Sequence, residues 1–150
     1  MEFLKFIADL YNVEAPDLLR RSEELLKQFA LSEWADEIIE AYSHGMKQRL
    51  IIAAALLHDP KVMIIDEPMI GLDPEAVRMV KDILKGLAAQ NVTIFVSTHT
   101  LSLAEDLCDR IGVIHKGTLL AQGTVSDLNL AAKTGEAKLE EVFLTLVREA

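Results

Sequence analysis

Residues 62–68, VMIIDEP, are a short apolar run that ends abruptly in the adjacent carboxylates of Asp66 and Glu67. Continuous rather than alternating hydrophobicity is typical of a strand that is covered on both faces, as in a parallel sheet. A few residues later, Asp73 and Pro74 provide the capping residue and the first-turn proline of a helix start. We therefore predict a buried strand followed by a helix.

A second apolar run, residues 92–96, follows that predicted helix. A strand, a helix and a second strand in this order form a right-handed crossover, which makes the two strands parallel. Ligands of such sheets bind at the carboxyl ends of the strands. Asp66, Glu67 and His99 all fall at those ends.

The flanking segments are predicted from the spacing of their apolar residues. Residues 1–41 have a helical pattern, and a further helix is expected from about Ser43 to Leu57. After the second strand we expect a helix at residues 101–108, a hairpin at 110–121 with Lys116 and Gly117 in its turn, and an amphipathic helix from about 139 to 148. The predicted class is α/β, with an N-terminal α-helical lobe and a C-terminal hairpin and helix.

Composition narrows the class of protein. The chain of 150 residues fits one domain, and although 51% of it is hydrophobic, no apolar run approaches the roughly 18 residues of a membrane span. A net charge of -9 without a cluster of Lys and Arg argues against nucleic acid as a direct partner. Cys108 is the single cysteine and the N-terminus lacks the pattern of a secretory signal, so we predict a cytoplasmic location.

The carboxylate pair at the end of the first strand requires compensation, because charges that emerge from an apolar strand lose hydration. A hard divalent cation suits such a site. Asp66 would hold Mg²⁺, and Glu67 would orient or deprotonate a water that attacks a phosphate. The alternative is an acidic strand end that caps a neighbouring helix.

Residues 43–49, SHGMKQR, begin the helix that precedes this strand. The first amides of a helix have no intrahelical partners and bind phosphate well. Ser43 would add a hydroxyl, and Gly45 would let the backbone approach an anion, although a plain serine N-cap explains Ser43 equally well. Asp73 is likewise expected as a helix cap, and His99 either donates to a terminal phosphate or is structural.

Taken together and in this order, SHGMKQR, VMIIDEP, GLDP and STH resemble the motifs of the ABC ATPases, and the resemblance covers essentially all 150 residues. YSHGM at 42–46 stands where that family commonly has the signature LSGGQ. Ser43 and Gly45 match this signature, and the other three positions differ. The difference at Met46 affects the contribution that the last signature residue normally makes. By this likeness Asp66 is the Walker B aspartate and Glu67 the catalytic glutamate. Asp73 is then the D-loop aspartate and His99 the switch histidine.

The resemblance implies a P-loop NTPase-like parallel sheet, with a helical subdomain at residues 1–58 that ends in the signature helix. A partial RecA-like ATPase core would occupy residues 59–130, followed by the C-terminal amphipathic helix at 131–150. It further implies ATP and Mg²⁺ as cofactors, a second ATP-binding subunit that completes the nucleotide site, and a separate membrane permease on whose cytoplasmic side the subunit lies. Residues 42–50, with LEEVFLTLV near the end, resemble the subunits that serve exporters.

The sequence has no G-x-x-x-x-G-K-[ST] motif, which is the Walker A loop that cradles the phosphates. The Q-loop glutamine and the adenine-stacking aromatic of the family normally precede the region seen here. We therefore expect a domain cut just before its helical lobe, with an incomplete sheet whose edges and apolar faces are uncovered and which self-associates. We expect this chain alone to lack ATPase activity.

Two other functions remain open at this point. One is a non-hydrolytic interaction module that offers its signature face to another ATPase subunit, although such a module would not need both Glu67 and His99. The other is a non-transport ABC protein that acts on ribosomes or DNA. The acidic balance of the chain and its lack of a coiled coil or basic arm disfavour the second alternative.

Overall fold

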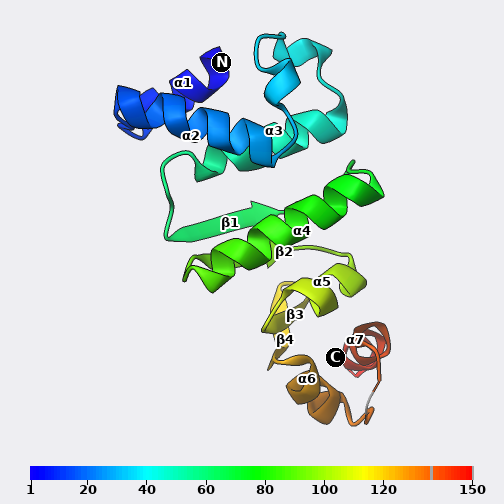
Figure 1. Ribbon diagram of the computed structural model, residues 1–150. Coiled ribbons are helices and arrows are strands. Elements are labelled where there is room, and N and C mark those ends of the chain that lie inside the picture. The colour runs from blue at the N-terminus through cyan, green and yellow to red at the C-terminus, as the bar shows by residue number, and fades with distance from the viewer. Residues whose placement is uncertain (136, 150) are drawn as a thin grey trace. The chain divides into compact units, whose positions relative to one another are not determined.

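The computed structural model describes residues 1–135 and 137–149, which form two compact units, Met1–Ser97 and Thr98–Ala150. The elements of the first unit are the helices α1 (Glu2–Leu10), α2 (Ala15–Gln28), α3 (His44–Leu56) and α4 (Pro74–Ala89), the short 3₁₀ helices η1 (Ser32–Trp34) and η2 (Ile39–Ala41), and the strands β1 (Val62–Asp66) and β2 (Thr93–Ser97) (Figure 1). The second unit contains α5 (Leu101–Leu107), β3 (Ile111–His115), β4 (Thr118–Gly123), α6 (Val125–Ala132) and α7 (Leu139–Arg148). The expected division at residues 58 and 130 concerns functional parts and stays a prediction; residues 136 and 150 of its last part lie outside the described residues.

Helices α2 and α3 each donate an arginine hydrogen bond to the C-terminal end of the other. Arg49 of α3 donates from Nη1 to the carbonyl oxygen of Phe29, the C-cap residue of α2, at 2.7 Å. Arg21 of α2 donates from Nη1 to the carbonyl oxygen of Leu57, the C-cap residue of α3, at 3.1 Å. The last carbonyls of a helix carry its negative dipole end, so a cation there is favourable. The two helices are thereby fixed against each other.

The predicted strands and the helix between them are confirmed. Strands β1 and β2 pair in parallel, with Ile64 opposite Phe95 and Asp66 opposite Ser97. Figure 1 shows α4 lying along these two strands, and the buried residues of α4 recur at helical spacing. Asp73 caps this helix and Pro74 occupies its first turn, as the sequence indicates.

The prediction that β1 is covered on both faces is wrong for this structure. Met63 is 5% exposed, but Ile64 is 80% exposed and Phe95, its partner on β2, is 61% exposed. Side chains alternate between the faces of a strand, so one face of the pair is covered and the other is open. The predicted uncovered apolar face is therefore present, because the described residues of this unit supply no second layer over it.

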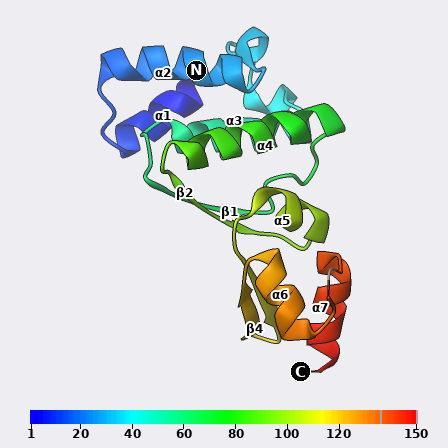
Figure 2. The same cartoon turned by 60° about the horizontal axis from the view of Figure 1, so that its bottom comes forward.

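The second unit is built on the predicted hairpin, in which β3 and β4 pair antiparallel. Lys116 and Gly117 have φ of 47° and 78°, as a two-residue primed turn requires, and glycine adopts this conformation without strain. Helices α6 and α7 lie side by side against β4 (Figure 2), and Val113, Leu128 and Val142 form the centre of this core. Helix α7 confirms the predicted amphipathic helix.

Helix α6 was not predicted, although the sequence carries its start signal. Thr124 Oγ1 accepts from the Asp127 N–H at 3.2 Å, and Asp127 Oδ2 accepts from the Thr124 N–H at 2.9 Å. This reciprocal pair is a capping box. The hydrogen bonds from Thr124, first from its backbone and then from its hydroxyl, hold the pKa of Asp127 below its ordinary value.

We predict that Thr124→Ala lowers the melting temperature of the second unit, because loss of a helix cap typically costs about 1 kcal/mol. A depressed carboxyl pKa stabilises the fold above the unfolded pKa, and this contribution is lost as the pH falls through the folded pKa. The difference between the wild type and the variant should therefore shrink in acid. Ser126→Ala is the matched control, and an equal loss in both variants at all pH values would refute the capping role.

We also predict that the open face of β1 and β2 drives self-association, since Ile64 and Phe95 form an exposed cross-strand pair. The double variant Ile64→Thr with Phe95→Thr should reduce the mass measured by light scattering. Leu130→Thr, which changes a residue of α6 that is 78% exposed, should not. A wild-type chain that is monomeric and melts cooperatively in calorimetry would contradict this prediction.

Candidate functional site

The carboxyl ends of β1 and β2 meet at the expected pair of residues. Asp66 and Ser97 are opposite each other in the final register position, and the Ser97 hydroxyl donates to Asp66 Oδ1. Asp66 is exposed, so the loss of hydration expected for a carboxylate at the end of this apolar strand does not occur in this structure. Asp66 lies on the same strand face as Ile64, which is the open face.

Glu67 follows the strand in a left-handed backbone conformation, with φ of 47°. This conformation costs a residue with a Cβ about 1–2 kcal/mol, and such outliers occur often at functional sites. Two backbone hydrogen bonds hold the turn: the Glu67 N–H donates to the Ser97 carbonyl oxygen at 2.9 Å, and the Ile70 N–H donates to the Glu67 carbonyl oxygen at 3.3 Å. Glu67 is thus the half-buried first residue of a fixed turn.

Ser43 forms the N-cap of α3, with Oγ accepting from the Met46 N–H at 3.2 Å. The capping alternative raised by the sequence is therefore real. Because Ser43 is exposed, its hydroxyl and the start of the helix remain accessible from outside the chain. The role of Ser43 toward phosphate stays a prediction.

Gly45 has a packing role that the sequence did not reveal. A Cβ placed on Gly45 would lie 2.9 Å from the carbonyl oxygen of Gly71, closer than side-chain carbons normally approach. Gly71 itself has φ of 76°, and a Cβ there would lie 2.0 Å from Cδ2 of His44. The start of α3 therefore contacts the loop after β1 through two glycines, and neither position has room for a side chain.

Asp73 is the N-cap of α4, and its Oδ1 accepts from the Ala76 N–H at 2.9 Å. The loop that begins at Glu67 and ends at Asp73 is thus anchored at both ends and touches α3 in its middle. His99 belongs to the second unit, where it is exposed, and Thr98 separates it from the end of β2 in the chain. The structure brings the segments of Ser43, Glu67 and Asp73 together within the first unit.

One residue of this region was missed by the sequence analysis. Gln48 Nε2 lies 3.5 Å from the carbonyl oxygens of both Glu67 and Pro68, so α3 contacts the turn of Glu67 as well as Gly71. The signal available in the sequence was its position one helical turn after His44. Residues four apart on a helix share a face, so Gln48 lies on the same face of α3 as His44, which contacts the loop after β1.

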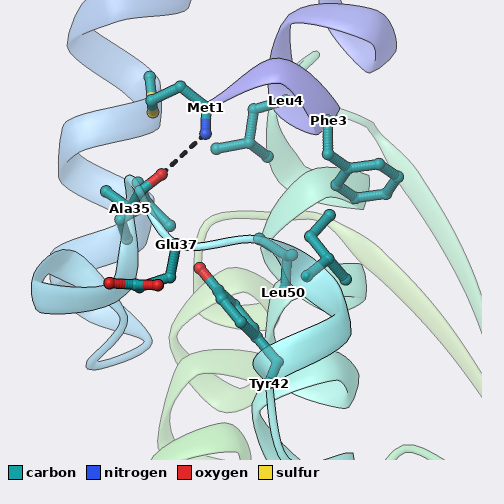
Figure 3. A pocket seen from close by; sticks show the side chains of 9 residues that line it. Met1, Phe3, Leu4, Ala35, Glu37, Tyr42 and Leu50 are labelled. Carbon is teal, nitrogen blue, oxygen red and sulfur yellow. Dashed lines mark hydrogen bonds between the residues drawn. The ribbon is translucent and has the colours of Figure 1, made fainter.

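Tyr42 precedes the N-cap and anchors this end of α3. Its hydroxyl donates to the Trp34 carbonyl oxygen at 2.6 Å, and the side chain is 6% exposed. Burial, followed by the nearby charge of Glu37, raises the pKa of Tyr42, which keeps the hydroxyl protonated. Figure 3 shows Tyr42 beside Leu50 in a cavity of about 20 Å³. That volume holds about one water, so it is no nucleotide site.

A larger cavity, of about 290 Å³, is lined by Arg20, Arg21, Leu56 and Asp59 among others. Leu56 is the last residue of α3, so this cavity lies at the opposite end of the helix from Ser43. Neither cavity is lined by a predicted site residue. The site residues of the first unit lie on accessible surface instead.

Among residues 1–135 and 137–149, no group of three or more His, Cys, Asp or Glu side chains could hold a metal ion. Mg²⁺ usually keeps several waters and takes one or two carboxylates together with substrate phosphates. The carboxylate of Asp66 and the hydroxyl of Ser97 fit that limited protein contribution.

The chain was compared with known proteins. A sequence family described as "ABC transporter" matches residues 5–70. The linearmycin resistance ATP-binding protein of Bacillus subtilis is 38% identical over 149 residues, which are 99% of this chain and 47% of that protein. The bacitracin transport ATP-binding protein of Enterococcus faecalis is 42% identical over 108 residues, 71% of this chain and 35% of that protein.

A solved structure of an ATP-binding subunit of an ABC transporter matches with a TM-score of 0.91 and 34% identity, over 97% of this chain and 61% of that one. This match confirms the predicted P-loop NTPase-like α/β class. The chain spans about half the length of the curated relatives that it matches. Within the described residues, no helix is both long and apolar enough to cross a bilayer.

We predict that Gly45→Ala destabilises the first unit by about 1–3 kcal/mol, because the added methyl group overpacks against the Gly71 carbonyl. Gly86→Ala is the matched control: Gly86 lies in α4, and a Cβ there meets nothing within 4 Å. The control should stabilise by about 0.5–1 kcal/mol through helix propensity. Both can be measured by chemical denaturation. Equal effects would show that the contact with Gly71 imposes no constraint.

Proposed function

Because the chain belongs to the ABC transporter ATP-binding proteins, we propose that it is the signature-to-C-terminal part of an ATPase subunit that powers export through a separate membrane permease. The observation that carries this proposal is the fixed left-handed turn of Glu67, directly beyond Asp66 and in contact with the start of α3. Through this turn, Glu67, whose carboxylate is suited to activate water, contacts α3, whose start is suited to bind phosphate.

Asp66 and Ser97 are the groups of this chain that would hold Mg²⁺, through water or directly, at the ends of the paired strands. When bound, the ion neutralises charge on the phosphate oxygens of ATP. The hydrogen bond from Ser97 fixes one oxygen of the Asp66 carboxylate. The orientation of that carboxylate is therefore set before any ligand arrives.

Glu67 is the group that would orient the attacking water and accept its proton. Its backbone is held at the N–H by Ser97 and at the carbonyl by Ile70 and Gln48. With the backbone of Glu67 fixed on both sides, only its side-chain torsions remain to be ordered when substrate binds. Such preorganisation lowers the cost of reaching the reactive geometry.

Ser43 and Gly45 would serve the nucleotide of a second ATP-binding subunit rather than that of their own chain. Ser43 is exposed at the N-terminal end of α3, where free N–H groups and the helix dipole favour a γ-phosphate. Asp73 would act from the adjoining loop. His99, exposed after β2, would donate a hydrogen bond to the γ-phosphate of its own site.

The proposed direction of transport rests on relatives whose names refer to linearmycin resistance, bacitracin transport and fluoroquinolone export. We propose a subunit of the same kind, peripheral on the cytoplasmic face of the membrane and paired with a second ATP-binding subunit. A neighbouring gene for a six-span membrane protein would support this assignment.

We predict that Glu67→Gln, placed in a domain completed by a segment with a Walker A loop, abolishes ATP turnover and preserves ATP binding. Loss of a general base typically lowers the rate by about 10² to 10⁴-fold. Turnover can be followed by phosphate release and binding by calorimetry, with Glu75→Gln in the first turn of α4 as the control. Undiminished hydrolysis in Glu67→Gln would contradict the assignment of Glu67 as the general base.

A further inference from the structure

We propose that Gln48 is a positioning residue: its side-chain amide holds the turn of Glu67 and so ties the start of α3 to the carboxylate segment of the same chain. The proposal rests on the proposed function for the meaning of Glu67, but its structural part does not. Gln48 touches neither a substrate nor a reacting atom in this assignment.

The amide of Gln48 faces two consecutive carbonyls. Nε2 lies 3.5 Å from the Glu67 oxygen and 3.5 Å from the Pro68 oxygen, across 19 and 20 residues of chain. An NH₂ group has two donor hydrogens, so one side chain can serve both acceptors. Pro68 is fully buried, and Gln48 itself is half-buried.

The turn that Gln48 reaches is the strained one. Glu67 has φ of 47°, a conformation that a residue with a Cβ keeps only when its surroundings enforce it. The Ser97 carbonyl restrains it from β2, and the Ile70 N–H restrains it from the loop itself. Gln48 adds a restraint from α3, a separate element.

The other contact of α3 with this loop makes the link stiff. Gly45 and Gly71 approach so closely that a Cβ on Gly45 would meet the Gly71 carbonyl at 2.9 Å. A shift of the first turns of α3 therefore moves the loop as well. If Ser43 contacts the nucleotide of a second subunit, as proposed, Gln48 carries the effect of that contact to Glu67.

The test measures hydrogen exchange of the Glu67 N–H in the intact chain, because this N–H reports on the turn through its bond to Ser97. Gln48→Leu keeps the volume but removes the donors. It should speed exchange at Glu67 by about tenfold, the size expected for loss of one or two hydrogen bonds, while leaving exchange at Leu84 in the core of α4 nearly unchanged.

Two variants sharpen this result. Gln48→Lys retains a donor of similar reach and should restore slow exchange, whereas Gln28→Leu, an exposed glutamine of α2, should change nothing. Equal acceleration at Glu67 and Leu84 would mean general destabilisation and would overturn the proposal. Unchanged exchange at Glu67 in Gln48→Leu would overturn it too.

In the completed domain, Gln48→Leu should lower kcat for ATP with little change in KM, since the residue acts on the catalytic turn and not on nucleotide binding. If exchange responds as expected but the completed domain does not hydrolyse ATP, the proposed function fails and the positioning role stands. If hydrolysis is present and exchange at Glu67 does not respond, the positioning role fails alone.

Discussion

The contact between the first turn of α3 and the loop after β1 is the constraint on which the described site depends. Gly45 and the Gly71 carbonyl are so close that no side chain fits between them, and the ring of His44 fills the space beside Gly71. This contact places a helix start next to the segment that carries Glu67 and Asp73. Without it, the serine hydroxyl and the carboxylates would belong to unrelated parts of the surface.

The rest of the first unit keeps that contact in place. Arg49 and Arg21 close the ends of α2 and α3 reciprocally, and the buried Tyr42 hydroxyl binds the Trp34 carbonyl just ahead of the N-cap. On the open face of the sheet, the apolar side chain of Ile64 is exposed to water. The unit is thus organised around the sheet edge that carries Asp66 and Glu67, and it has one apolar face that its described residues do not cover.

Much of this fold is predictable from local signals. Pro74 after Asp73 marks a helix start, Lys116 with Gly117 marks a hairpin turn, and the apolar run before Asp66 marks a strand; all three depend on neighbours in the sequence. The continuous apolar run alone predicted cover on both faces of β1, which was wrong because exposure depends on which layers cover a sheet; the open face was expected only from the incompleteness of the sheet. The packing role of Gly45 depends on Gly71 and the reach of Gln48 on Pro68, and both partners lie far along the chain, beyond any local sequence pattern. The proposed catalytic roles of the site residues are inferred from the sequence motifs, and the structure shows where these residues lie and what their segments contact.

The central claim is that this chain contains Glu67, the proposed catalytic carboxylate of an ATPase, but not the Walker A loop that binds the phosphates. The most direct test measures ATP binding and hydrolysis by the chain alone and after it is joined to an N-terminal segment with a Walker A loop. The account predicts activity only in the joined form. A joined form that is folded and inactive would contradict the claim and would favour a non-hydrolytic module that completes the site of another subunit.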